Sequence, residues 1–189
     1  MHLVIFDLET TGYSPRYHDI IQIAAVRMRH GEILAAEHFA TFVRPPGHIP
    51  QPITGLTGIT ETDVHDAPEP AACLAAFSRF VGDATLIAHN GHRFDMPFLH
   101  ESATRHGLPL REVPSLDSIE LSRQLWPSAR SHNLDAVIER LGLSTVGLRR
   151  HDARADVRLL AEAVRQMWQR LGLPFDRAPV APAIRQLPA

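Results

Sequence analysis

A chain of 189 residues with 44% hydrophobic and 21% charged residues has the size and composition of one globular domain with a substantial core. Its net charge near −2 argues against a protein that coats long nucleic acid by charge alone. All 19 basic residues are arginine, which excludes every mechanism that requires a lysine.

The chain shows no signal for a membrane or for disulfide chemistry. No apolar run approaches the roughly 18 residues that span a bilayer, and the first residues already have strand character. We therefore expect a cytoplasmic protein. The single cysteine, Cys73, excludes an internal disulfide and a thiolate metal cluster, and its apolar surroundings predict a small core residue.

The N-terminal part of the chain favours three consecutive strands. His2–Asp7 is a short apolar run rich in β-branched side chains, which suits a buried strand. Asp19–Arg29 and Ile33–Val43 are the next two candidates, and the dipeptide His30-Gly31 between them is typical of a hairpin turn. The pattern predicts an antiparallel meander.

Helices dominate the rest of the chain. Arg44–Pro52 contains four prolines and is predicted to be a loop. In chain order, we then expect two short helical turns at Ile53–Asp63, a helix at about Pro68–Val81, a strand at Thr85–His89, a helix at about Asp95–His106, a short strand at Ser115–Ser118, and helices at Ile119–Trp126, Asn133–Leu141 and Asp152–Leu171.

The last residues differ in composition from the rest. From Leu173 onward the chain carries four prolines in 17 residues and few large apolar side chains. We therefore predict a domain at residues 1–172 and a proline-rich tail at residues 173–189 that contributes little to the core. Such a tail is also the candidate tether to a protein partner.

Three strands in a meander followed by strand–helix units predict an α/β fold. We expect a central mixed sheet of five strands, made of the meander and βα units and flanked by helices. In such sheets the carboxyl ends of the strands, where loops lead into helices, are the usual place for chemistry.

Two acidic residues end the first predicted strand, in the run FDLETTG at residues 6–12. Side chains two apart in a strand point to the same face, so Asp7 and Glu9 present two carboxylates side by side. Repulsion would keep one of them protonated unless a divalent cation lay between them. Oxygen ligands of this kind suit Mg²⁺ or Mn²⁺. Taken alone, the pair is equally compatible with two solvated acids at an exposed strand end.

Two more acidic residues lie at predicted helix starts. Asp95 follows the strand at Thr85–His89, where a helix N-cap would also explain it. Asp156 lies one turn into a small, apolar helical face, where an unpaired carboxylate would be costly. His151 precedes Asp156 by five residues and by itself is compatible with a surface loop. Because the three signals occur in order at strand ends and helix starts, together they favour one site.

The runs FDLETTG, HNGHRFDMPFL and HDARADV resemble the three exonuclease motifs of the DnaQ-like superfamily in its DEDDh form. The segments ITGLTGITETDV and SLDSIELSRQLWP, with SHNLDAVIERLGL, also resemble the connecting segments of that family. The resemblance covers roughly residues 1–171. It implies a ribonuclease H-like fold, two divalent metal ions, Mg²⁺ or Mn²⁺, and removal of nucleotides from 3′ ends.

The second motif has one residue more between its asparagine and its aspartate than is usual in polymerase proofreading subunits. In this respect HNGHRFDMPFL is more similar to the three-prime repair exonuclease type. The spacing therefore argues against a dedicated proofreading subunit.

The resemblance also implies roles for individual residues. Asp7 would lie between two metal ions, with Glu9 and Asp156 completing the site of the attacking water. Asp95 would act at the second metal, and His151 would take the proton from the water.

Residues around these five would hold the substrate. The backbone of Thr10, Thr11 and Gly12 is expected at the terminal 3′-hydroxyl, and Asn90 beside Asp95 as a positioning residue. Leu56 and Thr57 are the candidates for packing on the terminal bases, although core packing of Leu56 is equally compatible with the sequence. Four arginines flank the third motif and either contact phosphates or form a solvated face; these are Arg130, Arg149, Arg150 and Arg154.

The expected function is hydrolysis of phosphodiester bonds at the 3′ end of DNA, single-stranded or frayed, with release of nucleoside 5′-monophosphates in DNA repair, proofreading or nucleic-acid turnover. An exoribonuclease that trims short RNA or tRNA ends is the alternative, because the motifs do not reveal contacts near the 2′-position.

A catalytically inactive nucleic-acid-binding module is a remote alternative, since all four carboxylates and the histidine are present. A haloacid dehalogenase-type phosphatase is excluded, because Glu9 stands where it needs a second aspartate and the chain has no lysine.

Overall fold

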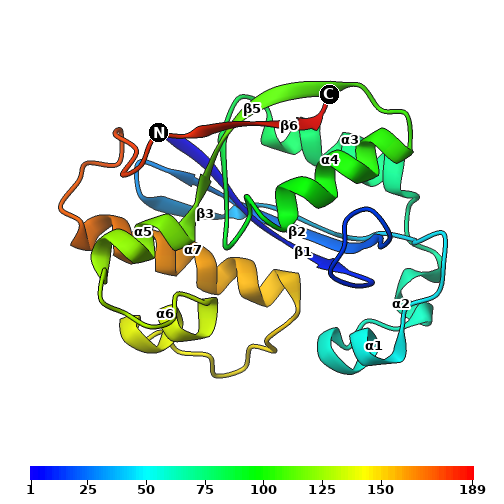
Figure 1. Cartoon of the computed structure of the whole chain (residues 1–189), viewed down its shortest axis with the longest axis horizontal. Coiled ribbons are helices and arrows are strands. Elements are labelled where there is room, and N and C mark those ends of the chain that lie inside the picture. Colours follow the sequence, from blue (N-terminus) through cyan, green and yellow to red (C-terminus); the bar gives the residue numbers. More distant parts are fainter.

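The computed structural model describes residues 1–189 and centres on a six-stranded mixed sheet with the order β3-β2-β1-β4-β5-β6 (Figure 1). The first three strands form the predicted antiparallel meander, β4 and β5 run parallel to β1, and β6 runs antiparallel to β5. The strands are β1 His2–Thr10, β2 Ile20–Arg29, β3 Glu32–Phe42, β4 Thr85–Ala88, β5 Leu110–Asp117 and β6 Ala183–Pro188.

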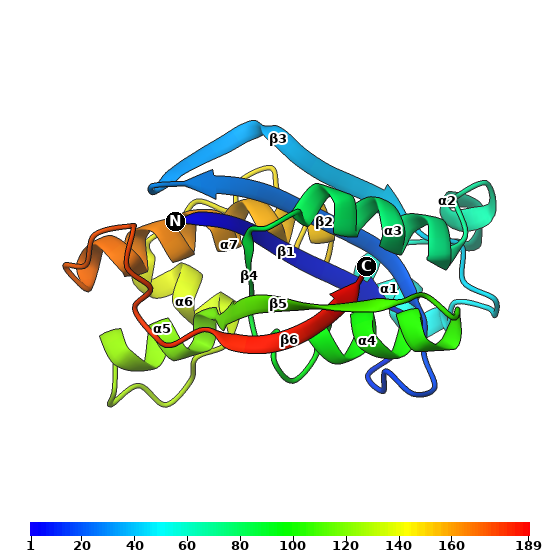
Figure 2. The ribbon, with the colours of Figure 1, turned by 90° about the horizontal axis from the view of Figure 1, so that it is seen from above.

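Helices cover both faces of the sheet (Figure 2). One core lies between the sheet and the helices α5, α6 and α7, and a second lies between the sheet and α3 and α4. The short helices α1 and α2 surround a separate small cluster of isoleucines and valine. The helices are α1 Gln51–Thr57, α2 Glu61–His65, α3 Pro70–Val81, α4 Asp95–Arg105, α5 Ser118–Leu125, α6 Leu134–Leu141 and α7 Ala153–Arg170.

The alternation of β1 sets the direction of its acidic residues. Leu3 and Ile5 belong to the core under α7, whereas Phe6 belongs to the core under α3 and α4. Because side chains two apart share a face, Asp7 and Glu9 continue the face of Ile5 and point toward the α7 side of the sheet. The carboxyl end of β1 thus presents two carboxylates to the start of α7.

Most predicted elements are confirmed. The hairpin turn has positive φ at both central residues, 49° at His30 and 85° at Gly31, as a tight turn between twisted strands requires. Cys73 is a buried core residue. None of the helices combines the length and the apolar composition needed to cross a bilayer.

The expectation of a five-stranded sheet and of a C-terminal segment outside the core is wrong. Residues 183–188 form β6, which pairs with β5 from Leu110 to Ser115 and extends the sheet by one strand. Leu187 is fully buried, and the ring of Phe175 stacks on that of Trp168 at 5.5 Å. Few apolar residues are enough here because Leu187 occupies a core position and Phe175 packs on the buried Trp168, and prolines are tolerated at the ends of an edge strand. Composition alone does not reveal such pairing.

The buried position of Leu187 leads to a stability prediction. Replacement by alanine is expected to lower the free energy of unfolding by about 2–5 kcal/mol, because the substitution removes fully buried methyl groups and leaves a cavity. Denaturant unfolding measures the change. Ile184→Ala is the matched control, since that side chain is 57% exposed on the same strand and should cost little. Equal effects of the two substitutions would contradict a core role for Leu187.

Candidate active site

The acidic end of β1 meets the start of α7. Asp152 is the N-cap of α7, and its carboxylate accepts a hydrogen bond from the backbone N–H of Arg154 at 3.0 Å. Asp156 lies one turn further along, is buried, and accepts a hydrogen bond from the backbone N–H of His151 at 3.2 Å. His151 has a φ of 60°, a conformation that turns the chain sharply just before the helix.

Gln22 explains how the start of α7 is fixed against the sheet. It lies opposite Glu9 in the register of β1 and β2 and is buried. Its amide oxygen accepts from the backbone N–H of Ala153 at 2.9 Å, and its amide nitrogen donates to Asp152 at 3.3 Å. The sequence offered no reason to assign a role to this glutamine, because its partners are 130 residues away along the chain.

Asp95 begins α4, but the N-cap explanation for it is wrong. The N-cap position is Phe94, no side chain caps this helix, and Asp95 is 2% exposed. Its Oδ1 atom is buried without a hydrogen-bond partner. Since an unpartnered buried carboxylate oxygen is costly, Asp95 has the property of a residue that accepts a cation or a bound water.

A second buried aspartate holds the loop before Asp95. Asp117 accepts hydrogen bonds from the backbone N–H groups of Asn90 at 3.0 Å, His92 at 3.2 Å and Ile119 at 3.0 Å. These contacts tie the loop after β4 to the start of α5. Sequence reasoning missed this residue, because the only signal was an aspartate at a helix start.

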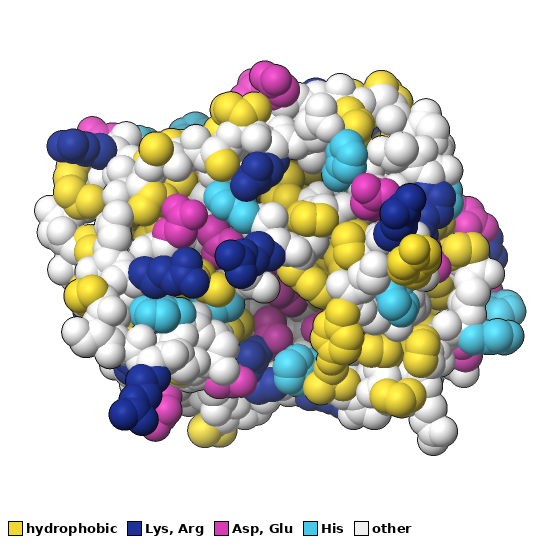
Figure 3. Space-filling model, viewed as in Figure 1, with side chains coloured by type: hydrophobic (Ala, Val, Ile, Leu, Met, Phe, Trp, Pro, Cys, Tyr) yellow, Lys and Arg dark blue, Asp and Glu magenta, His cyan; other side chains and the backbone are white.

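These elements surround a cleft of about 220 Å³. Figure 3 shows acidic side chains at the bottom of a hollow near the middle of the view, with histidine beside it. Ligand atoms of Glu9, His151 and Asp156 lie within 4.8 Å of one another. The lining residues are Asp7, Leu8, Glu9, Thr10, Gly12, Tyr13, Ile53, Leu56, Thr57, Phe94, His151 and Asp156.

Four of the five residues predicted as catalytic therefore line one cleft. Asp95 is not a lining residue, but its charge acts on Asp7 and Glu9. Burial, together with the negative charges of Asp95 and Glu9, raises the pKa of Asp7 well above its usual range. Burial and the charge of Asp95 raise the pKa of Glu9 to about 7. Burial is also the main cause that raises the pKa of Asp95 to about 7, and the charge of Asp117 adds to it.

Such a cluster cannot carry all its negative charges at neutral pH without a compensating cation. Carboxylate oxygens of Glu9 and Asp156 lie close together here, and Asp95 contributes an oxygen that no protein group satisfies. Oxygen-rich donor sets of this kind fit hard divalent cations. The residues present therefore fit the divalent metal ions that the motifs imply.

The raised pKa values predict how the stability of the metal-free protein depends on pH. Between about pH 4.5 and pH 7 the folded protein holds protons on Glu9 and Asp95 that the unfolded chain releases. The free energy of unfolding should thus fall as the pH rises through this window, by on the order of 3 kcal/mol for one such group. Urea unfolding in a chelator across this range measures the effect. A flat profile would contradict it, and Mn²⁺ should reduce the fall.

One arginine reaches into the cluster. The guanidinium of Arg150 forms ion pairs with Asp156 and, at 2.8 Å, with Asp135 on α6. Its charge lowers the pKa of Asp7 and of Glu9, opposing the larger effect of burial. Arg154 instead pairs with Asp152 at 2.7 Å. Only Arg150 therefore departs from the solvated face that was one of the two expectations for this group, since Arg130, Arg149 and Arg154 are exposed.

The predicted substrate-binding residues divide into two groups. Thr10, Gly12, Leu56 and Thr57 line the cleft, whereas Thr11 is not among the lining residues. Leu56 is 41% exposed, so the core-packing alternative for it is wrong.

Asn90 also lies outside the cleft lining. It has a φ of 62°, and its carbonyl accepts hydrogen bonds from the N–H groups of Arg93 and Phe94. Its observed role is to shape the turn that leads to Asp95. Tyr13 and Phe94 line the cleft although the sequence gave them no role.

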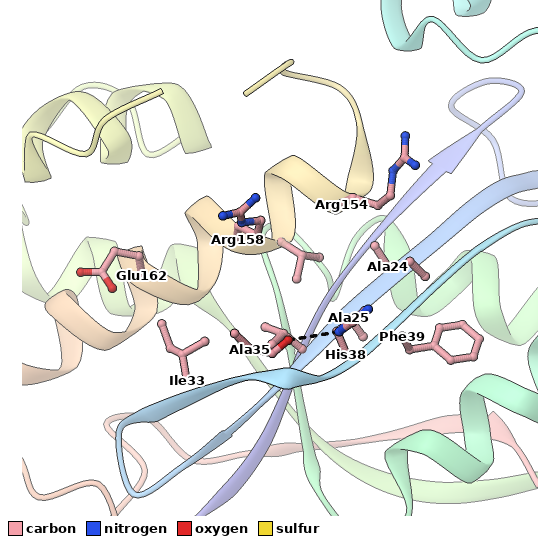
Figure 4. Close-up of a pocket in the computed structure, with 12 residues that line it drawn as sticks. Ala24, Ala25, Ile33, Ala35, His38, Phe39, Arg154, Arg158 and Glu162 are labelled. Atoms are coloured by element: carbon pink, nitrogen blue, oxygen red, sulfur yellow. Dashed lines mark hydrogen bonds between the residues drawn. The ribbon is translucent and has the colours of Figure 1, made fainter. Parts of the chain in front are cut away.

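A second, larger groove of about 560 Å³ lies between β3 and the first half of α7 (Figure 4). Figure 4 shows Arg154, Arg158 and Glu162 on the helix side and alanines on the sheet side. Several of its polar groups are paired: Glu162 binds Arg165 at 2.5 Å, Arg154 binds Asp152 at 2.7 Å, and the ring of His38 contacts the carbonyl of Ala35 at 3.1 Å. The groove has no cluster of metal-binding side chains.

Comparison with known proteins supports the resemblance to exonucleases that the three motifs carry. Residues 4–164 match the family RNase_T, described as exonuclease. The chain is 42% identical over 153 residues to DNA polymerase III PolC-type of Latilactobacillus sakei and 37% identical over 176 residues to that of Halalkalibacterium halodurans. These matches cover 81% and 92% of this chain but only 10% and 12% of the polymerases, so the chain spans about a tenth of their length.

Solved structures show the same fold. Exonuclease X in complex with 5′ overhanging duplex DNA has a TM-score of 0.74 at 25% identity, and the match covers 92% of this chain and 95% of that one. For E. coli exonuclease I the TM-score is 0.77 at 20% identity, with 93% of this chain and 42% of that chain covered.

The spacing of the second motif pointed to the three-prime repair type, whereas the two relatives matched by sequence are DNA polymerases. The spacing alone therefore does not assign a subgroup. With matching motifs, fold and relatives, the chain belongs to the exonuclease family, among the DnaQ-like 3′–5′ exonucleases with a ribonuclease H-like fold.

Proposed function

We propose that the chain hydrolyses the phosphodiester bond at the 3′ end of single-stranded or frayed DNA and releases nucleoside 5′-monophosphates. The observation that carries this proposal is the convergence of Asp7, Glu9, His151 and Asp156 on one cleft, with the charge of the buried Asp95 acting on Asp7 and Glu9. These residues come from β1, α4 and the start of α7, and no structural need of the fold explains so many acidic groups together.

Asp7, Glu9 and Asp156 are the residues that would hold two divalent cations, Mg²⁺ or Mn²⁺, with Asp95 at the second ion directly or through water. When bound, the ions supply a deprotonated water and stabilise the charge on the phosphate and the leaving oxygen. The protein keeps the ligands in place through short backbone links, such as the N–H of His151 on Asp156 and the Gln22 contacts to the start of α7.

His151 is suited to accept the proton of the attacking water. Burial and the nearby charge of Arg150 lower its pKa from 6.5, so the imidazole is neutral at physiological pH. A neutral imidazole in the cleft lining has a free lone pair for a proton. Because its ring lies within 4.8 Å of the ligand atoms of Glu9 and Asp156, it would stand next to a water held by a cation on those carboxylates.

The remaining cleft wall is suited to a terminal nucleotide. Leu56 and Tyr13 present exposed apolar surface to the cleft, which favours stacking or packing on a base of any identity. Thr10 donates its hydroxyl to the carbonyl of Gly12 at 2.6 Å, which fixes the backbone that borders the cleft. The apolar surface of Leu56 and Tyr13 thus supports digestion of a 3′ end of any sequence.

DNA is the favoured substrate because the relatives matched over most of this chain are DNA polymerases, and exonuclease X was solved with duplex DNA bearing a 5′ overhang. By the same relation, the biological role is proofreading, repair or turnover of DNA.

The test uses 5′-labelled DNA and RNA oligonucleotides of matched sequence, with Mg²⁺ or Mn²⁺. We expect DNA to shorten in single-nucleotide steps and the label to stay on the shortening strand. Faster loss from RNA would assign the exoribonuclease alternative. If the protein binds oligonucleotides but hydrolyses neither DNA nor RNA with either ion, only the binding-module alternative would remain.

A further inference from the structure

The loop between β1 and β2 carries both tyrosines of the chain, Tyr13 and Tyr17. Their side chains are 77% and 76% exposed, among the few large apolar side chains on the surface. Tyr13 and the exposed Leu56 line the catalytic cleft. Tyr17 lies outside it, and nothing in the fold requires an aromatic ring at that position.

The loop is held rigid although it is exposed. Arg105 on α4 donates to the carbonyl of Pro15 at 2.8 Å and to that of Arg16 at 3.4 Å, and forms an ion pair with Asp19. The backbone N–H groups of Tyr17 and His18 both donate to the carbonyl of Ser14, at 3.1 and 2.9 Å.

The other end of the loop is equally constrained. The hydroxyl of Thr11 accepts from the backbone N–H of Asp19 at 2.9 Å. The ring of His18 packs on Gly12 so closely that a Cβ there would lie 2.3 Å from it. Because the backbone of the loop is already ordered, binding of a ligand that stacks on Tyr17 would cost little conformational entropy.

The position of the loop relates Tyr17 to the substrate path. In Figures 1 and 2 the loop lies next to α4 at the carboxyl end of β1. Tyr17 lies four positions after Tyr13, so their Cα atoms are within about 14 Å of each other. A few nucleotides of an extended strand span such a distance. Arg16, the residue before Tyr17, is also exposed, and its positive charge forms no ion pair with an acidic residue.

We propose that Tyr17, assisted by the charge of Arg16, forms an outer stacking site for a nucleotide upstream of the scissile 3′ end. Exposed rings next to cations bind single strands irrespective of sequence, since every base has a face to stack. The ligand is single-stranded DNA that continues from the cleft over the loop. The inference rests on the proposed exonuclease function. Such a site would make the enzyme prefer strands that are longer than the cleft itself holds.

The experiment compares Tyr17→Ala and Tyr17→Phe with the unaltered chain on a dinucleotide and on an oligothymidine dodecamer. For Tyr17→Ala we expect the KM for the dodecamer to rise about tenfold, as loss of one stacked base predicts, with kcat unchanged. The KM for the dinucleotide should not change. Tyr17→Phe keeps the ring and should behave like the unaltered chain.

Binding gives a readout that does not depend on turnover. Fluorescence anisotropy of a labelled dodecamer on the Asp7→Asn background should show the same weakening for Tyr17→Ala. Arg16→Gln should reduce the slope of log affinity against log salt by about one. An unchanged dodecamer KM in Tyr17→Ala, or an equal rise for the dinucleotide, would overturn the outer site alone. The exonuclease proposal itself fails only if the unaltered chain shortens no oligonucleotide.

Discussion

Asp7→Asn is expected to lower the rate of 3′-end hydrolysis by at least about a thousandfold, equivalent to roughly 4 kcal/mol of transition-state stabilisation. Asparagine has nearly the same shape as aspartate but lacks the charge that would hold two cations. Asp7 is the residue on which the charges of both Asp95 and Glu9 act, so it lies at the electrostatic centre of the cluster. Single-turnover hydrolysis of a 5′-labelled strand in Mn²⁺ measures the loss.

The same substitution should have the opposite effect on metal-free stability. Asp7 is buried among like charges, and this raises its pKa. Asparagine is neutral in this buried site without having to take up a proton, so at neutral pH the metal-free variant should melt at a temperature equal to or above that of the unaltered chain. Each kcal/mol gained corresponds to about 2–4 °C for a domain of this size.

Asp66→Asn is the matched control for both measurements. The side chain of Asp66 is 97% exposed and contacts only His65, so neither the rate nor the melting temperature should change appreciably. A variant of Asp7 that lost activity by unfolding would melt earlier than this control, and such a result would remove the evidence for a role in the chemistry.

The strand β1 illustrates what the sequence could predict. Its apolar run and its two acidic residues two apart follow from the periodicity of a strand alone, and the structure places both carboxylates on the α7 side. Asp156 was recognisable because a buried charge in a small apolar helix face requires a reason. These inferences depend only on local spacing, which the sequence contains in full. His151 by itself was compatible with a surface loop, and only the resemblance of HDARADV to the third exonuclease motif assigned it a role.

Other features depend on contacts between distant segments. Gln22 holds the start of α7 across 131 residues of chain, and a glutamine within a strand gives no signal of that partner. The strand β6 was missed for the same reason, because backbone pairing with β5 leaves no compositional trace in a proline-rich segment. Asp117 could be recognised as a helix N-cap, but its hold on the loop before Asp95 could not.

His151→Gln tests the second large effect, the loss of the general base. We expect kcat to fall by about a hundredfold to ten thousandfold, the usual contribution of a positioned base, while the affinity for Mn²⁺ changes little. Glutamine preserves the approximate size of the ring but cannot take a proton at neutral pH. His48→Gln is the control, because the side chain of His48 is fully exposed.

The pH profile separates this role from a structural one. Burial and Arg150 lower the pKa of His151 from 6.5, so the base remains neutral and competent below pH 6.5. In the unaltered chain the acid limb of kcat should therefore lie below that pH, and kcat should fall as the imidazole becomes protonated. In His151→Gln that limb should disappear or shift, since no imidazole is left to titrate. If the variant kept the same limb at a uniformly lower rate, the proton acceptor would have to be another group, and His151 would only position the water through its backbone link to Asp156.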